Sequence, residues 1–252
     1  VHEGEEVIGA VIVLLDITEQ EQREQLRREF TANVSHELKT PLTSISGFAE
    51  LMKTGTVPQE DVVDFSARIY DEASRLIALV GDIIKLSELD EGGSFASAAE
   101  DVDLRALCEE IWDRLSPAAQ ARAVTFSVTG EEVRLHTSRK MLEEIIYNLC
   151  DNAVKYNRVG GKAEAVISRS EDQKVMLKIR DTGIGIPDED QQRVFERFYR
   201  VDKSHSREIG GTGLGLSIVK HGAAALGIEI RLESREGVGT SVTLTFPPEL
   251  IV

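Results

Sequence analysis

Two long stripes of apolar residues with helical spacing occupy the first third of the chain and restrict its fold more than any other feature. In the first stripe apolar residues recur every three or four positions, and the stripe ends at Lys53-Thr54-Gly55. The second stripe begins after Pro58 and keeps heptad spacing. Two such helices joined by a short turn predict an antiparallel helical hairpin over residues 19–91. The stripes consist of Phe30, Val34, Leu38, Leu42, Ile45, Phe48 and Met52, and of Val62, Phe65, Ile69, Leu76, Leu79, Ile83 and Leu86.

The second helix is too apolar for one hairpin to cover. Ile77, Val80 and Ile84 widen its stripe beyond a single seam, so a lone hairpin would leave much of this surface in water. Dimerisation would cover it. The pattern therefore predicts a dimeric antiparallel four-helix bundle with one hairpin per protomer.

The rest of the chain mixes helical and strand patterns. Residues 92–101 begin with a small, glycine-containing stretch that predicts a linker, and residues 102–252 follow as a second domain. We expect a sheet with helices on one face there, which places the whole chain in the α+β class. The expected helices lie near residues 104–115, 139–156 and 214–226, and the expected strands near 124–128, 133–135, 163–168, 175–180, 228–234 and 240–246.

Charge and cysteine usage narrow the possible functions. The formal net charge of −15 should repel phosphate backbones, so the sequence predicts no nucleic-acid partner. Cys108 and Cys150 sit far apart inside apolar helical patterns. This placement predicts buried thiols in a reducing compartment and argues against a disulfide or a metal site.

The N-terminal segment opens in a strand pattern, Val7–Thr18, and without an initiating methionine. We therefore expect a fragment whose upstream part is missing. The apolar run Val7–Leu15 is far shorter than the roughly 20 residues that span a bilayer as a helix, so no transmembrane helix is expected.

One side of the first helix carries reactive side chains. His36 lies on the side opposite the apolar stripe and should face solvent, because successive helical residues are about 100° apart. Glu37 is its neighbour and Thr40 lies one turn on, so an imidazole, a carboxylate and a hydroxyl share an accessible patch. Pro41 cannot donate a hydrogen bond to the carbonyl of Glu37 and should bend or loosen the helix. The plainer interpretation is an exposed histidine before a proline that ends the helix.

A polar face of a helix in the second domain is a candidate nucleotide site. Asn148, Asn152 and Lys155 are spaced three and four residues apart and so share one side. Amides beside a lysine suit phosphates and Mg²⁺, which prefers oxygen ligands. An ordinary polar helix face would look the same. The chain has no GxxxxGK[ST] loop that would offer another phosphate site.

Two glycine-rich segments could complete such a site. Asp181–Pro187 follows a strand, and its carboxylate could accept a hydrogen bond from an exocyclic amine while its glycines admit a flat ligand. Gly210–Leu216 precedes a helix whose N-terminus could face phosphate oxygens. Between them, Phe195–Arg200 and Lys203–Ser206 look like an aromatic hinge and a mobile lid, from which Arg200 could reach a γ-phosphate. Each segment alone could equally be a turn.

The combination of these segments resembles the bacterial sensor histidine kinases. Ser35–Leu42 resembles the family's phosphoacceptor box, and the family's four catalytic-domain boxes follow it in order and at similar spacing. The resemblance covers residues 19–246. It implies that the second domain is the α/β sandwich shared with gyrase-type and Hsp90-type ATPases. It also implies that residues 1–18 are the last strand and exit of a PAS-like sensor domain.

The resemblance also implies roles for individual residues. His36 would be the phosphoacceptor, Glu37 the general base, and Thr40 the residue that aligns water for dephosphorylating the partner. Arg200 would contact the γ-phosphate and Asn152 would hold Mg²⁺. Asp181 would bind the adenine amino group. The implied ATP-binding residues are Asn148, Asn152, Lys155, Tyr156, Asp181, Gly183, Gly185, Ile186, Gly211, Thr212, Gly213, Leu214, Gly215 and Leu216.

The expected protein is the cytoplasmic portion of a membrane-anchored, homodimeric histidine kinase. It would autophosphorylate His36 from Mg-ATP, pass the phosphoryl group to an aspartate of a response regulator, and also act as its phosphatase. It would meet the membrane only through upstream segments. The segment His221–Gly227 departs from the family's commoner pattern, which puts the packing of the preceding helix in doubt.

Two alternatives remain open at this point. A gyrase- or Hsp90-type ATPase would carry a glutamate one helical turn before the Mg²⁺-binding asparagine, whereas this chain has Asn148 before Asn152. A nucleotide-dead dimeric scaffold that docks regulators on its bundle would bind no ATP. Survival of ATP turnover in His36→Gln would favour the first alternative, and failure to bind an ATP analogue the second.

Overall fold

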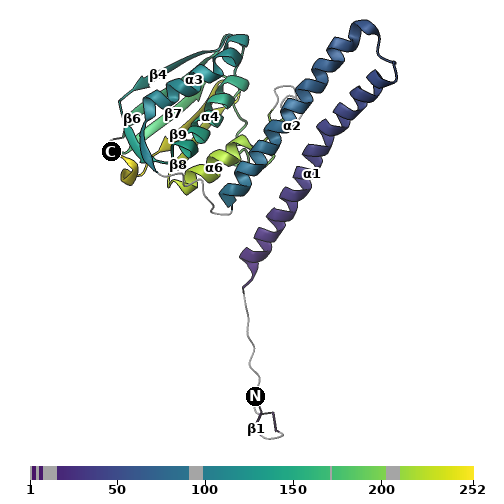
Figure 1. Ribbon diagram of the computed structural model, residues 1–252. Coiled ribbons are helices and arrows are strands. Elements are labelled where there is room, and N and C mark those ends of the chain that lie inside the picture. Colours follow the sequence, from purple (N-terminus) through teal and green to yellow (C-terminus); the bar gives the residue numbers. More distant parts are fainter. Residues whose placement is uncertain (1, 4–5, 8–15, 91–98, 171, 203–210) are drawn as a thin grey trace.

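The chain forms a long helical hairpin and an α/β domain that packs against it in the computed structural model (Figure 1). The structure describes residues 2–3, 6–7, 16–90, 99–170, 172–202 and 211–252. Within these ranges no helix has the length and apolar character that crossing a membrane requires. The α+β architecture predicted from the sequence is confirmed.

The hairpin consists of helix α1, Thr18–Lys53, and helix α2, Val62–Asp90, joined through the 3-10 turn η1, Gln59–Asp61. The turn after α1 has Gly55 at φ +69°, a conformation that glycine adopts readily. Pro41 is buried within α1, and the helix continues through it to Lys53. The proline therefore does not end the helix.

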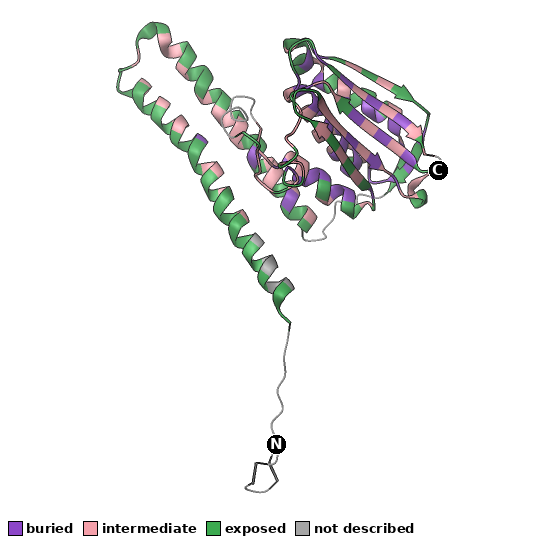
Figure 2. Cartoon of the chain, turned by 180° about the vertical axis from the view of Figure 1, so that it is seen from behind, coloured by how far each residue is buried: buried purple, intermediate pink, exposed green. Residues whose placement is uncertain are grey.

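Most residues of the hairpin are exposed or partly buried in the single chain (Figure 2), and several of the exposed ones are apolar. Val63, Tyr70 and Ile77 of α2 are 75%, 73% and 73% exposed, and Leu42 of α1 is 55% exposed. Such side chains in a long row favour burial against another protein surface. Ile77 and Leu42 belong to the stripes that dimerisation was predicted to cover, whereas Val63 and Tyr70 extend the exposed surface beyond them.

The α/β domain is built on a five-stranded sheet of order β4-β6-β7-β9-β8, with helices α3, α4 and α6 on one face (Figure 1). β4 and β6 run parallel, and the other neighbours are antiparallel. β6 and β7 alternate buried and partly exposed residues, as a sheet covered on one face requires. The strands are β4 Thr125–Gly130, β6 Lys162–Arg169, β7 Val175–Asp181, β8 Glu229–Arg235 and β9 Gly239–Thr245; the helices are α3 Leu104–Ala121, α4 Arg139–Lys155 and α6 Gly215–Ala225.

A second sheet has two strands, of which the sequence predicted β5, near residues 133–135, but not β3. Strand β3, Glu100–Asp103, pairs antiparallel with β5, Arg134–Thr137. Its first two residues fall in the predicted linker 92–101, of which residues 92–98 lie outside the described part. The acidic sequence of β3 buries only Val102, so it lacks the alternating apolar pattern that identifies a strand. The short 3-10 turn η2, Pro248–Leu250, follows the large sheet.

The predicted strand at the N-terminus, Val7–Thr18, is largely outside the described residues. Short strands β1, His2–Glu3, and β2, Glu6–Val7, pair with each other. At the other end of the prediction Thr18 is the first residue of α1, not part of a strand.

The core of the α/β domain explains two sequence features. Cys108 and Cys150 are both buried free thiols in it, as predicted. Gly222 in the unusual segment 221–227 packs α6 closely onto α4, since a Cβ there would lie 2.8 Å from Sδ of Met141 and 3.2 Å from Cγ1 of Ile145. A small residue at position 222 thus maintains the helix contact that the sequence left in doubt.

The two parts of the chain share a second apolar cluster. Leu79 and Leu86 of α2 are buried together with Leu214 and Ile218, which lie at the start of α6. Phe30 of α1 joins this cluster and stacks in a tilted arrangement on Phe198, with ring centroids 5.8 Å apart. The α/β domain therefore docks on one side of the hairpin.

Candidate functional site

A cavity of about 460 Å³ opens between α4, the ends of β7 and β9, the loop before α6, and helix α2. Its volume is in the range of small-molecule and cofactor sites. Most of the residues predicted to bind ATP line it, although they come from three separate segments. They are Asn148, Asn152, Lys155, Tyr156, Asp181, Gly185, Ile186, Gly211, Thr212, Gly213, Gly215 and Leu216, and Arg200 lines the cavity with them.

Two predicted ligand residues do not line the cavity. Gly183 is buried beneath the loop, where a Cβ would lie 2.2 Å from the backbone oxygen of Tyr156. Leu214 is fully buried against Leu79 and Leu86 of the hairpin. Gly183 therefore allows close packing of the loop, and Leu214 anchors the glycine-rich segment to the hairpin.

Asp181 lines the cavity and is held by two backbone donors. Its Oδ1 accepts hydrogen bonds from the N–H of Gly183 at 2.8 Å and of Thr240 at 3.2 Å. Burial raises the pKa of this carboxyl, while the two backbone bonds lower it. Ile179, Ile186 and Val242 line the same cavity. Both bonds engage Oδ1, so Oδ2 is the carboxylate oxygen left for a ligand, beside these apolar side chains.

The two glycine-rich loops need glycine at specific positions. Gly185 has φ +71°, and a Cβ there would lie 2.1 Å from the backbone oxygen of Arg235. Gly213 has φ +75°, and its carbonyl accepts the N–H of Phe198 at 2.9 Å. The Oγ1 of Thr212 accepts the N–H of Leu214 at 3.3 Å, just before α6 begins at Gly215. These contacts direct the start of α6 toward the cavity, where its free N–H groups favour an anion.

The polar face of α4 forms one wall of the cavity. Asn148 donates through Nδ2 to the backbone oxygen of Glu144 at 2.8 Å, and a Cβ on Gly215 would lie 2.7 Å from its Oδ1. Lys155 forms an ion pair with Asp151 at 2.7 Å. Asn152 lines the cavity between them. The helix thus places amides and a cation on one face, at the spacing the sequence indicated.

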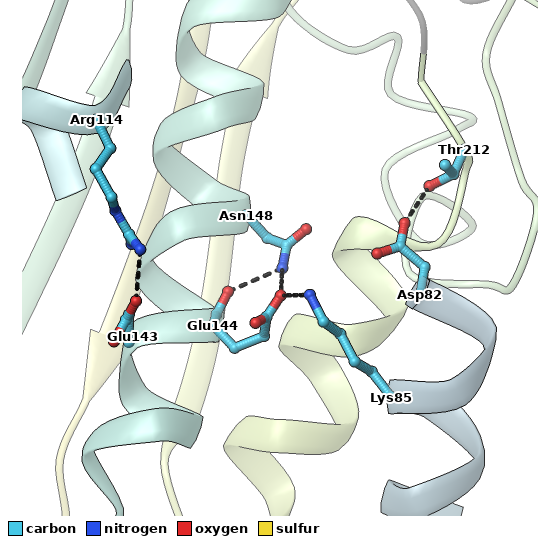
Figure 3. A network of polar contacts seen from close by, with 7 residues as sticks. All are labelled: Asp82, Lys85, Arg114, Glu143, Glu144, Asn148 and Thr212. Atoms are coloured by element: carbon cyan, nitrogen blue, oxygen red, sulfur yellow. Dashed lines mark hydrogen bonds and ion pairs between the residues drawn. The ribbon is translucent and has the colours of Figure 1, made fainter. Parts of the chain in front are cut away.

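Helix α2 of the hairpin closes the opposite side of the cavity with residues that the sequence analysis missed. Asp82 accepts a hydrogen bond through Oδ2 from Oγ1 of Thr212 at 2.8 Å, and Lys85 forms an ion pair with Glu144. Figure 3 shows Lys85 and Asn148 reaching the same Glu144 side chain from different helices. The sequence did contain a signal for these residues, because Asp82 and Lys85 are charged residues between the apolar positions Leu79 and Leu86. The partner of that polar face could not be inferred.

The reactive patch of α1 lies beside the same interface. His36 and Thr40 are exposed, and Oγ1 of Thr40 donates to the backbone oxygen of His36 at 3.2 Å. Glu37 is half-buried and accepts a hydrogen bond from Arg200 at 3.0 Å. The Arg200 side chain is only 5% exposed and also donates to the backbone oxygen of Thr212 at 3.0 Å. Glu37 is thus turned toward the α/β domain while its neighbour faces solvent.

A third polar contact ties the domains together below this patch. Arg197 pairs with Asp90 at the end of α2, donates to Nε2 of His221 at 3.2 Å, and lies over the ring of Phe30 at 5.1 Å. Burial is the main cause that lowers the pKa of His221, and Arg197 adds to it. The segment 203–206, predicted as a mobile lid, lies outside the described residues.

The chain matches two family models. Residues 26–92 match the His Kinase A (phospho-acceptor) domain, and residues 137–250 match the Histidine kinase-, DNA gyrase B-, and HSP90-like ATPase. The first match covers most of the hairpin, and the second covers most of the α/β domain that contains the cavity.

Curated relatives match over nearly the whole chain. The Sensor histidine kinase WalK of Bacillus subtilis is 36% identical over 242 residues, which cover 95% of this chain and 39% of that protein. The Sensor protein kinase WalK of Staphylococcus haemolyticus is 37% identical over 247 residues, which cover 97% of this chain and 40% of that protein. The chain thus spans about two fifths of the length of these relatives.

Solved structures share the fold. The histidine kinase AdeS of Acinetobacter baumannii superposes with a TM-score of 0.69 at 24% identity, over 84% of this chain and 96% of that chain. Full-length ShkA, solved in complex with AMPPNP, gives 0.63 at 26% identity, over 89% of this chain and 45% of that one. The histidine kinase ThkA, solved with the response regulator protein TrrA, gives 0.68 at 23% identity, over 93% and 67%.

Proposed function

Since this chain belongs to the sensor histidine kinases of two-component signalling, we propose that it transfers the γ-phosphoryl group of Mg-ATP to Nε2 of His36. From there the group would pass to an aspartate of a response regulator. The observation that carries this proposal is the cavity in which Asp181, the amide face of α4 and the loop before α6 meet. An exposed histidine at the domain boundary supplies the nucleophile.

In this proposal Asp181 selects adenine. Its Oδ2 accepts from the exocyclic amine, while Ile186 and Leu216 contact the ring. Asn148, Lys155 and the N–H groups at the start of α6 bind the phosphates. ShkA, a relative of known structure, was solved in complex with AMPPNP, which supports a nucleotide in this position.

The cavity also fits a magnesium ion shared with the nucleotide. Among the described residues no cluster of three or more His, Cys, Asp or Glu side chains is placed to hold a metal. Mg²⁺ suits a site with few protein ligands, because it keeps several of its waters and takes its other ligands from the phosphates of the substrate. The amide oxygen of Asn152 would be its protein ligand. The ion would neutralise charge on the phosphate oxygens.

The transfer step needs a nucleophile and a proton acceptor. The lone pair of His36 Nε2 attacks the γ-phosphorus, the bond to the β–γ bridging oxygen breaks, and ADP leaves with that bond's electrons. Glu37 takes or holds the imidazole proton as general base. Arg200 stabilises the charge on the γ-phosphate oxygens. Asn148 stands one turn before Asn152, so no carboxylate at that position activates water for hydrolysis.

The same patch supports a phosphatase activity toward the regulator. Thr40 is exposed one turn from His36, and its hydroxyl can orient a water for attack on an aspartyl phosphate. In Thr40→Ala, dephosphorylation of a purified phosphorylated regulator should fall while labelling of His36 persists. Loss of both activities, or of neither, would contradict this role.

Two protein partners follow from the exposed hairpin. A second copy would cover the row that includes Val63, Tyr70 and Ile77. A response regulator would dock beside His36, as expected for a kinase whose relative ThkA was solved with the response regulator TrrA.

The proposal is tested by incubating the chain with Mg²⁺ and γ-labelled ATP. We expect label on wild type that is lost in acid and kept in alkali, as for phosphohistidine, and no label on His36→Gln. The matched control is His136→Gln, an exposed histidine of β5 paired with Asp101, which should label normally. Equal labelling of His36→Gln and wild type would refute the assignment. Failure of wild type to bind ATP would refute the function.

A further inference from the structure

Two carboxylates of the hairpin contact groups that the proposed function assigns to the phosphate end of the nucleotide. Asp82 of α2 accepts from Oγ1 of Thr212 at 2.8 Å, and Glu37 of α1 accepts from Arg200 at 3.0 Å. Thr212 lies in the loop before α6, and Arg200 also contacts the backbone of that loop. The hairpin thus engages the loop and the arginine at once.

These contacts have the chemistry of a bound phosphate. A carboxylate oxygen and a phosphate oxygen are both anionic acceptors, and both take hydroxyl and guanidinium donors. Asp82 lines the cavity itself, with Thr212 and Lys85 around it. A triphosphate entering there would meet this carboxylate, and like charges within about 5 Å of each other repel strongly in a partly buried site.

The adenine end of the cavity is unaffected by these contacts. Asp181 and Ile186 lie on strand and loop segments of the α/β domain, and within the described part of the chain no hairpin residue forms a hydrogen bond or ion pair with either. The cavity has a volume of about 460 Å³ in this docked arrangement. We therefore expect the docked form to admit a nucleoside monophosphate more easily than a triphosphate.

We propose that Asp82 acts as an internal substitute for a phosphate, so that docking of the α/β domain on the hairpin and binding of the nucleotide's triphosphate exclude each other. ATP would displace Asp82 from Thr212 and undock the domain. Undocking separates Arg200 from Glu37, which frees the arginine for the γ-phosphate and the glutamate for His36. The inference rests on the proposed ATP-binding function and adds the residue that couples binding to domain release.

The first test measures affinity for nucleotides with three phosphates and with one. Fluorescent mant-ATP is titrated into wild type, Asp82→Asn and Asp71→Asn, and unlabelled ATP and AMP are then used as competitors. Asp82→Asn should bind ATP about tenfold more tightly, the size of a typical coupling between a ligand and a conformational equilibrium. The affinity for AMP should change less than about threefold. Asp71→Asn removes the same charge from an exposed position of α2 and should behave as wild type.

The second test traps the docked form. In Asp82→Cys/Thr212→Cys an oxidised disulfide would hold the loop on α2, and the natural thiols Cys108 and Cys150 should not interfere because both are buried. We expect the oxidised protein to lose most of its ATP affinity and to regain it on reduction, with AMP binding retained. Equal ATP binding in both redox states would overturn the inference.

The outcomes separate this inference from the function on which it rests. If wild type binds mant-ATP and Asp82→Asn binds it with the same affinity, the inference fails and the kinase assignment stands. An equal gain for AMP and ATP would also overturn it, because the effect would not involve the triphosphate. If neither wild type nor any variant binds ATP, the proposed function itself fails.

Discussion

The position of Asp181 predicts a change of base preference in Asp181→Asn. Both backbone donors, Gly183 and Thr240, bond to the same oxygen, Oδ1. An asparagine can keep its amide oxygen on these donors and turn its NH2 group to where Oδ2 lies. The adenine amine, itself a donor, would then face the NH2 donor of the asparagine and lose its hydrogen bond. The 6-oxo group of inosine is an acceptor and would form a hydrogen bond with the same NH2 group.

The magnitude follows from the lost bond. A hydrogen bond to a charged group contributes about 1.5–3 kcal/mol, which corresponds to a roughly 10- to 150-fold weaker affinity for ATP. The affinity for ITP should rise or stay constant. The substitution should not destabilise the fold. Burial raises the pKa of Asp181 in the folded protein above its pKa in the unfolded chain. Ionisation of this carboxyl therefore lowers stability as the pH rises from the unfolded-state pKa through the folded-state pKa. The asparagine removes that cost and should unfold at an equal or higher urea concentration at pH 7.

The assay is competition of ATP and ITP against mant-ATP for wild type and Asp181→Asn, with urea unfolding of both proteins as the control for folding. An ATP affinity unchanged in the variant would refute the contact with the adenine amine. Equal losses for ATP and ITP would refute the pairing argument, because they would indicate general damage to the cavity.

Three further predictions concern folding and assembly. Gly185→Ala should lower the free energy of unfolding by at least about 2 kcal/mol more than Gly160→Ala in urea melts, since both have positive φ but only Gly185 meets backbone, at 2.1 Å. Burial raises the pKa of Cys108 to about 12, so the native thiol should resist DTNB at pH 8. Between roughly pH 9 and 12 Cys108 should contribute a fall in stability of about 1.4 kcal/mol per pH unit, in addition to the contribution of Cys150, whose pKa burial also raises. Ile77→Glu should shift sedimentation from dimer to monomer, because Ile77 is 73% exposed in the single chain.

The sequence predicted the elements of the fold well where periodicity was long. The two hairpin helices and the helix predicted over 139–156 have apolar residues at repeated helical spacing, and this spacing can be recognised from the local sequence alone. Strand β3 was missed because its partner β5 is about thirty residues away and only Val102 is buried. A strand of four residues with one buried side chain has no periodic signal.

The site was predictable to the extent that its residues belong to motifs. Asn148, Asn152 and Asp181 line one cavity because helix spacing and a strand end place them there. Leu214 was assigned to the ligand since it lies inside the glycine-rich motif, yet it packs on the hairpin. Asp82 and Lys85 were missed for the complementary reason: their role depends on a contact between two domains that no local pattern encodes.

The apolar surface of α2 has two faces, one in contact with the α/β domain of the same chain and one open to a second copy of the chain. The whole wide stripe was predicted to contact a second copy of the chain, but Leu79 and Leu86 are covered by the α/β domain of the same chain. Ile77 and Ile84 remain 73% and 53% exposed and precede those leucines by two residues, or about 200° around the helix. The exposed row therefore lies on the face opposite the docked one. A second copy can cover Ile77 and Ile84 whether the α/β domain is docked or released, so dimerisation does not oppose the release of the domain by ATP.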